Sequence, residues 1–130
     1  MRSGQPAKAP ACIVTGGETT VTIKGEGLGG RNQEFVLAAA IQITGLENVV
    51  VFSAGTDGTD GPTDAAGAIA DEETLLKADQ LGLSPSDFLA RHDAYHFFQA
   101  TGDLLRTGLT ETNVMDVQVI LIGASSKPNE

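Results

Sequence analysis

The sequence of 130 residues carries 17 acidic and 8 basic side chains, which give a net charge of −9 at neutral pH. Apolar residues make up 41% of it and charged residues 19%, which is typical of a folded globular domain and excludes a disordered chain. A surface this acidic repels phosphate backbones, and no apolar run approaches the ~20 residues that span a bilayer, so we expect neither nucleic-acid nor membrane partners.

Cys12 is the single cysteine of the sequence. One thiol cannot form a disulfide framework or a cysteine-based zinc site, so a reducing, cytoplasmic location is expected. Its position inside an apolar run predicts that the thiol is buried. We expect residues 1–10 to be a flexible segment, residues 11–124 a single α/β domain, and residues 125–130 a flexible tail.

The first half of the chain predicts two strands, a glycine-rich loop, a helix and a third strand. An apolar strand over 11–15 turns at Gly16-Gly17 into an alternating, half-exposed strand over 19–24. Four glycines then lie between residues 25 and 30, and a largely apolar helix is expected over 31–44 with Gly45 as its stop. The β-branched and aromatic run over 49–52 is typical of a strand covered on both faces.

The second half predicts three helices and a final strand. Asp71 is a candidate cap for a helix that runs to Leu81, Ser84-Pro85 is a good helix start, and Asp93 is a candidate cap for a short third helix. An apolar strand is expected over 117–122. Strands that alternate with helices indicate an α/β fold, a compact sandwich with a mixed sheet flanked by helices.

The glycine-rich loop matches the dinucleotide pattern Gly25-x-Gly27-x-x-Gly30. The strand before it is half polar, however, and Glu47, the acid at the expected spacing, precedes the next strand instead of ending it. Arg31-Asn32 also stand where a P-loop requires Lys-Ser/Thr. A general anion site at a helix N-terminus, made by Gly29, Gly30, Arg31 and Asn32, fits better. The alternative is that these glycines only form a tight turn.

An acidic loop follows the buried strand, with Asp57, Asp60 and Asp64 in a segment that contains no apolar residue between Thr56 and Asp64. Three carboxylates at the end of a strand could hold Mg²⁺ together with phosphate oxygens. Asp-Gly pairs also form ordinary turns, but two such pairs plus Pro62 exceed what a turn needs. Arg31 is the only basic residue between Lys24 and Lys77, which places one cation beside the two loops.

Two further segments could bind ligands. His92 and His96 have the spacing of a zinc motif, but the chain has only these two histidines, and Asp93 is explained better as a helix cap, so we do not expect zinc there. The hydroxyl-rich loop 107–113, which ends at Asn113, either lines a ligand cleft or is an ordinary loop.

Four blocks of residues resemble the C-terminal (MOFRL) domain of glycerate 2-kinases. They are Gly16-Gly17-Glu18-Thr19-Thr20-Val21, Gly29-Gly30-Arg31-Asn32-Gln33-Glu34-Phe35, the acidic loop from Thr56 to Gly67, and Gly102-Asp103-Leu104-Leu105 through Thr112-Asn113-Val114-Met115-Asp116. They cover nearly the whole chain in order. The family's last block reads Thr-Gly-Pro-Thr-Gly-Thr-Asn, so Leu109 and Glu111 are departures from it.

The resemblance implies a two-domain enzyme that transfers a phosphoryl group from ATP, with Mg²⁺, to D-glycerate and yields 2-phosphoglycerate. The active site would lie in the cleft with an N-terminal kinase domain in cis, so the isolated domain is expected to be inactive; a homodimer is also allowed. Arg31 would be the catalytic residue. Substrate or phosphate binding is expected at Gly29, Gly30, Asn32, Asp57, Gly58, Asp60, Asp64 and Asn113, metal binding at Asp57 and Asp60, and support of the site from Glu18 and Glu34.

Two other functions stay open at this point. The glycine pattern and the related substrates allow a hydroxypyruvate reductase that uses NAD(P)H. A short autonomous chain could also be a non-enzymatic ligand-binding or oligomerisation module.

Overall fold

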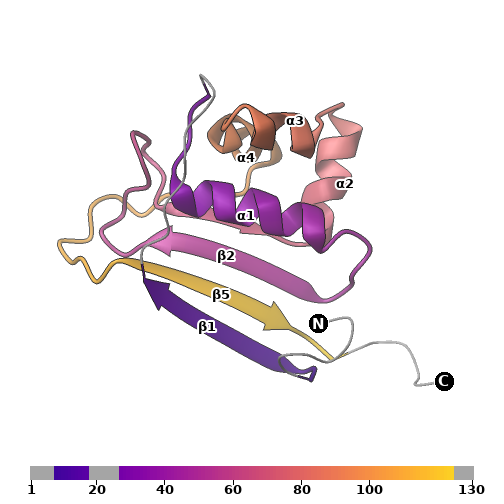
Figure 1. The fold of residues 1–130 in the computed structure, drawn as a ribbon, viewed down its shortest axis with the longest axis horizontal. Coiled ribbons are helices and arrows are strands. Elements are labelled where there is room, and N and C mark those ends of the chain that lie inside the picture. The colour runs from indigo at the N-terminus through magenta and orange to yellow at the C-terminus, as the bar shows by residue number, and fades with distance from the viewer. Residues whose placement is uncertain (1–7, 18–26, 125–130) are drawn as a thin grey trace.

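The computed structural model describes residues 8–17 and 27–124, which form a five-stranded sheet and four helices (Figure 1). The elements in chain order are β1 (Ala11–Gly17), α1 (Arg31–Gln42), β2 (Val49–Gly55), β3 (Gly67–Ala70), α2 (Glu72–Gln80), α3 (Pro85–Ala90), α4 (Ala94–Thr101), β4 (Leu104–Leu105) and β5 (Asp116–Ile122). The α/β class is therefore confirmed. None of the helices in these residues is long and apolar enough to cross a membrane.

The strands lie in the order β1-β5-β2-β3-β4, and each neighbouring pair is antiparallel. The expected mixed sheet is therefore wrong. The loop 56–66 reverses the chain between β2 and β3, and the three helices after β3 return it to the end of the sheet that it left. A connection that starts and finishes at one end of a sheet gives antiparallel neighbours, whereas a parallel pair needs a crossover to the opposite end.

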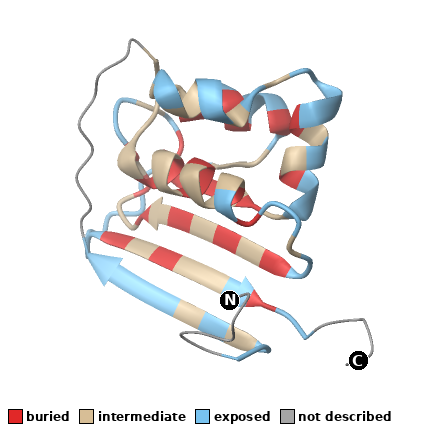
Figure 2. Ribbon diagram, turned by 45° about the vertical axis from the view of Figure 1, so that its right-hand side comes forward, coloured by how far each residue is buried: buried red, intermediate tan, exposed pale blue. Residues whose placement is uncertain are grey.

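The helices cover one face of the sheet (Figure 1). Val51 and its partner Ala70 are 0% and 1% exposed on that face. Val51 packs under α1, and Ala70 belongs to the apolar cluster that includes residues of α1, α2 and α4. Residues on the opposite face are less covered: Phe52 is half-buried, and Val14 is 62% exposed. Figure 2 shows that much of the edge strand β1 is exposed, whereas β2 alternates between buried and intermediate positions. The expectation that β2 is covered on both faces is therefore wrong for its second face.

β1 differs from its prediction in two respects. It continues through Gly16-Gly17, which pair with Val117 and Asp116 of β5 instead of forming a turn. Cys12 is exposed, because it lies on an edge strand and on the face without helices, so the buried thiol is also wrong. The second strand predicted over 19–24 lies outside the described residues.

Helix α1 forms the centre of the core. Val36, Leu37 and Ala40 are each 0% exposed, at the spacing that places them on one helix face. They pack with Phe97 and Phe98 of α4 in a single apolar cluster. The helix ends slightly before the predicted Thr44, and Gly45 follows with a left-handed φ of 83°, as expected for a glycine stop.

The later helices begin where the sequence predicted. The Asp71 side chain accepts hydrogen bonds from the backbone of Glu73 and Thr74 at the start of α2, and Ser84 caps α3 through Asp87 N. Asp93 precedes α4 but makes no cap bond to it. The short strands β3 and β4 were not predicted, because Gly67–Ala70 and Leu104–Leu105 are too short for a period to be read.

Candidate active site

On the helix-facing side of the sheet, the residues are apolar at one end of the strands and polar at the other. At one end Val49, Val51 and Ile120 pack under the C-terminal half of α1. At the other end the inward positions are polar: Ser53 pairs in register with Gln118, and Gly55 pairs with Asp116. The acidic loop, the N-terminus of α1 and the loop 106–115 all meet at this polar end, which is the candidate site.

Asp60 of the acidic loop caps α1 from outside the helix. Its carboxylate accepts hydrogen bonds from Asn32 N at 3.0 Å, Gln33 N at 2.8 Å and Asn32 Nδ2 at 3.1 Å. Asn32 also accepts from Ser53 Oγ at 2.6 Å, which ties the helix start to β2. Gly30, the N-cap residue, has no side chain for this task, so a carboxylate about 30 residues away in sequence supplies it.

The glycines here allow two backbones to approach each other. A Cβ on Gly30 would lie 2.4 Å from the Asp60 carboxyl, and one on Gly58 would lie 2.0 Å from the carbonyl oxygen of Gly108. Gly61 has a φ of 62° and rests against the Gly29 carbonyl. The glycine pattern that resembles a dinucleotide site therefore serves loop packing in the part that the structure describes.

Burial raises the pKa of Asp60 above its ordinary value, and the hydrogen bonds from Asn32 and Gln33 oppose that shift. The residue is only 3% exposed, and the two backbone donors at the helix start are already used. An external phosphate on these donors, or a metal on this carboxylate, would have to displace the internal contacts. Roles of Asp60 and Asn32 in shaping the site are therefore better supported than direct roles in binding.

Arg31, the first residue of α1, reaches from the helix to the sheet. Its Nε and Nη2 donate to the two carboxylate oxygens of Asp116 at 2.5 and 3.0 Å. Its side chain remains 35% exposed, whereas that of Asp116 is 1% exposed. The predicted catalytic cation thus lies at the polar end of the sheet, in a defined orientation.

Thr56 holds the acidic loop and the loop 106–115 together. Its backbone N and its Oγ1 both donate to the Met115 carbonyl, at 3.0 and 2.7 Å, and its Oγ1 also accepts from Val114 N at 2.8 Å. Thr110 closes the other side, because its backbone N donates to the Asp57 carbonyl at 3.2 Å. The acidic loop and the loop 106–115 therefore form one wall.

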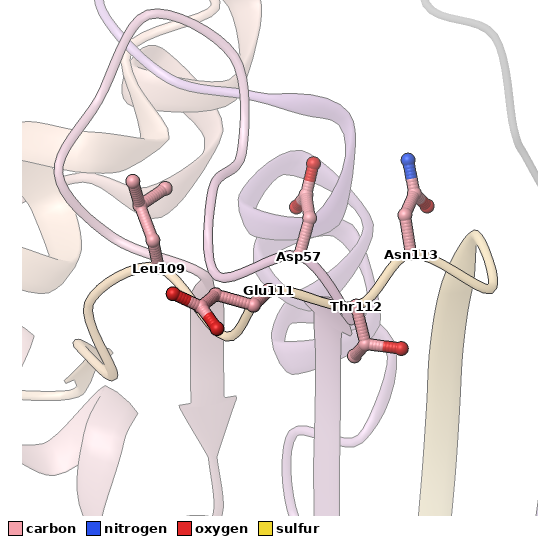
Figure 3. A pocket seen from close by; sticks show the side chains of 5 residues that line it. All are labelled: Asp57, Leu109, Glu111, Thr112 and Asn113. Atoms are coloured by element: carbon pink, nitrogen blue, oxygen red, sulfur yellow. The ribbon is translucent and has the colours of Figure 1, made fainter.

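A cavity of about 350 Å³ opens on this wall, lined by Asp57, Leu109, Glu111, Thr112 and Asn113. The side chains of Asp57 and Asn113 point in the same direction from the two loops (Figure 3). Asp57 also accepts from Thr59 N at 3.0 Å, so its carboxylate is oriented by its own loop. Of the three predicted aspartates, Asp57 is the one that lines this cavity.

Asp64 lies in a separate network. Its carboxylate accepts from Tyr95 Oη at 2.8 Å and from Arg106 Nε at 3.1 Å, and Arg106 Nη2 donates to Tyr95 Oη at 3.1 Å. The hydrogen bond from Tyr95 and the nearby guanidinium lower the pKa of Asp64. The three aspartates therefore point to three different partners. In residues 8–17 and 27–124, no group of three or more His, Cys, Asp or Glu side chains is placed to hold a metal.

Two more of the predicted residues are Glu34 and Glu18. Oε1 of Glu34 lies 2.6 Å from Nδ1 of His92, and the predicted role of Glu34 in supporting the site stays a prediction. His96 lies instead beside Asp93, at 2.7 Å, and Asp93 also accepts from Leu28 N at 2.9 Å. Glu18 lies outside the described residues.

Sequence reasoning missed Asp116 in the site and Arg106 in the separate network around Asp64. Asp116 directly precedes the predicted strand over 117–122. The signal available in the sequence was an acidic residue at the start of an otherwise apolar strand. Arg106 contradicts the expectation that Arg31 is the single cation near the acidic loop, since it contacts Asp64 from 42 residues away. No local pattern distinguishes it from other surface arginines.

Comparison with known proteins places the chain. A family model described as the MOFRL family matches residues 11–116.

The chain belongs to the MOFRL family.

Its relatives include the D-glycerate 2-kinase of Thermotoga maritima, which is 51% identical over 118 residues; the match covers 91% of this MOFRL chain and 28% of the relative. A protein of Agrobacterium vitis with the provisional name hydroxypyruvate reductase is 45% identical, with 92% and 28% covered. The crystal structure of a glycerate kinase from Thermotoga maritima superposes with a TM-score of 0.88 at 50% identity, with 92% and 29% covered.

The MOFRL chain therefore spans less than a third of the length of these relatives. It corresponds to the C-terminal region of glycerate 2-kinases, as the resemblance implied. The family and the fold are established by these matches.

Proposed function

We propose that this chain is the C-terminal part of an ATP-dependent glycerate kinase, in which it forms one wall of the active site. Arg31 carries the proposal. Its guanidinium is held at the end of the sheet where the acidic loop and the loop 106–115 meet, in a family whose relatives include a D-glycerate 2-kinase. The rest of the site, including an N-terminal kinase domain, would lie outside this chain.

The reaction transfers the γ-phosphoryl group of ATP to the C2 hydroxyl of D-glycerate. The bond between the γ-phosphorus and the bridging oxygen breaks, a bond to the hydroxyl oxygen forms, ADP leaves with the electron pair, and the hydroxyl proton is released. Negative charge spreads over the transferring oxygens, so catalysis depends mainly on positioning and on fixed positive charge. Arg31 would supply that charge from this wall.

Asp57 and Asn113 would orient the substrate or the metal from the cavity. Mg²⁺, when bound, would offset the negative charge of the phosphate groups. It prefers one or two carboxylates with phosphates and water, and Asp57 offers such an oxygen on the cavity wall. Asp60 fits that role poorly, because its carboxylate is buried against α1.

The test is ADP release by a chimera in which this chain replaces the matching region of the Thermotoga maritima D-glycerate 2-kinase, with ATP, MgCl₂ and D-glycerate. Arg31→Ala should lower kcat by about 10³- to 10⁵-fold. Arg91→Ala is the matched control, because Arg91 is 53% exposed and stacks on Phe88 outside the site. The isolated chain should release no ADP. A folded chimera without ADP release would contradict the kinase proposal.

A hydroxypyruvate reductase is the second candidate, since one relative bears that name. The packing of Gly30 against Asp60 argues against it, because the carboxylate occupies the helix start where a pyrophosphate would bind. Consumption of NADH by the same chimera with hydroxypyruvate, in place of ADP release, would support the reductase.

A further inference from the structure

The contact between Arg31 and Asp116 has the geometry of a fixed pair. The carboxylate receives two hydrogen bonds from the same guanidinium, through Nε at 2.5 Å and Nη2 at 3.0 Å. Two parallel bonds fix both the position and the plane of the guanidinium, which a single bond would leave free to rotate.

The sheet holds Asp116 in place for this contact. It is the first residue of β5 and is 2% exposed, with β1 on one side and β2 on the other. Its two cross-strand neighbours are Gly17 and Gly55. Because both are glycines, neither neighbouring strand puts a side chain between the carboxylate and α1.

The helix is fixed independently at the same point. Asp60 binds the backbone of Asn32 and Gln33, the two residues that follow Arg31. The backbone of Arg31 is therefore set by the acidic loop, and the end of its side chain is set by β5. The Arg31 side chain is therefore fixed at its backbone and at its guanidinium, while 35% of its surface remains exposed.

We propose that Asp116 is a positioning residue that aims the Arg31 guanidinium at the transferring phosphoryl group; this inference rests on the proposed kinase function. The carboxylate also offsets part of the positive charge of Arg31. Removal of the carboxylate has two opposing effects: the full positive charge of Arg31 becomes available, but its guanidinium is no longer held in one orientation. Misplacement of a catalytic group by ~1 Å can cost about 10²-fold in rate, so the loss of orientation should dominate.

The kinetic test uses the same chimera with Asp116→Asn, Arg31→Ala and the double variant. Asp116→Asn should lower kcat by about 10- to 10²-fold and leave the KM for ATP and D-glycerate within about threefold, because the contact acts on the transition state. The double variant should be no slower than Arg31→Ala alone, since a positioning residue has no effect without the group that it positions. Thermal melting checks that each variant is folded at the assay temperature.

Asp103→Asn is the matched control. Asp103 is also a largely buried carboxylate in an ion pair, with Lys77 Nζ at 3.1 Å, but it lies before β4 and away from Arg31. If the loss of any buried ion pair lowered the rate through instability, Asp103→Asn would lower it too. We expect its kcat to stay within about twofold of the parent.

A second measurement on the 130-residue chain does not depend on activity. The Nε–Hε signal of Arg31 in a nitrogen-15 NMR spectrum should be shielded from water exchange at neutral pH, should lose that protection in Asp116→Asn and should keep it in Asp103→Asn. An unchanged signal in Asp116→Asn would overturn the inference. So would a chimera that keeps the parent kcat in Asp116→Asn, or one that loses rate equally with and without Arg31. A parent chimera that is folded but releases no ADP would instead overturn the proposed function.

Discussion

Replacement of Gly30 by alanine tests whether Asp60 caps α1. The backbone of Gly30 has a φ of −139° and a ψ of 175°, which alanine adopts without strain, so any effect must come from the added methyl group. That methyl group would lie 2.4 Å from the Asp60 carboxyl carbon and from Oδ1, and 2.5 Å from the Asp60 carbonyl carbon. The acidic loop must therefore move away from the helix.

The expected cost has two parts. Overpacking a tight site costs about 1–3 kcal/mol, and loss of the hydrogen bonds that cap a helix costs about 0.5–2 kcal/mol. Together they give a loss of about 2–5 kcal/mol in the free energy of unfolding, which for a domain of this size lowers Tm by about 8–20 °C. Thermal and urea unfolding of the chain, followed by circular dichroism, measures both quantities.

Gly29→Ala is the matched control, because a methyl group there would meet its nearest neighbours at 3.5 Å, an ordinary contact. It should change stability by less than about 1 kcal/mol. In a double variant with Asp60→Ala, the cost of Gly30→Ala should shrink, since the carboxylate with which it clashes is gone. Equal stabilities of Gly30→Ala and Gly29→Ala would refute the capping role of Asp60.

Glu111→Gly should stabilise the chain by about 1 kcal/mol in urea unfolding, because Glu111 has a left-handed φ of 61° that glycine adopts freely. The control Thr112→Gly, at the next position, should bring no gain in stability. A destabilised Glu111→Gly would show that the glutamate side chain holds the loop. Asp93→Asn should flatten the acid side of the stability profile. Burial by itself raises the pKa of Asp93, but the hydrogen bond from Leu28 N and its charged neighbours leave it below its ordinary value. A lowered pKa means that Asp93 stabilises the fold above its unfolded pKa and that this contribution is lost as the pH falls below about 4. Melting temperatures of the parent, Asp93→Asn and the exposed control Asp79→Asn between about pH 2 and pH 6 measure the slope, and equal slopes would contradict the assignment.

Local patterns were sufficient for most of the helices. Asp71 and Ser84 were identified as caps because the side chain that accepts the hydrogen bond is only two or three residues from its donor. The start of α1 was placed correctly, but its cap was not, since Gly30 has no side chain and Asp60 comes from a distant loop. Capping within a turn can be read from sequence, whereas capping across the fold cannot.

The direction of the strands could not be read in the same way. The apolar run Val49–Phe52 suggested a strand covered on both faces, but apolar content does not reveal which neighbours lie beside a strand. The structure places β5 and β3 on either side of β2, both antiparallel, with helices over one face only. The far face of the sheet remains partly exposed, as Val14 and Leu121 illustrate.

The sequence by itself determined the α/β class, the family resemblance, and Arg31 and Asp57 as candidates, because the glycine and aspartate patterns that carry them are local in the chain. Only the tertiary structure decided which group each aspartate of the acidic loop contacts. Asp60 is directed to the backbone of α1, Asp64 to Tyr95 and Arg106, and Asp57 to the cavity. These carboxylates have the same chemistry and differ only in what the fold places opposite them. Asp116 was missed for the same physical reason: its role depends on an arginine 85 residues away, which reaches it only when α1 packs on the sheet.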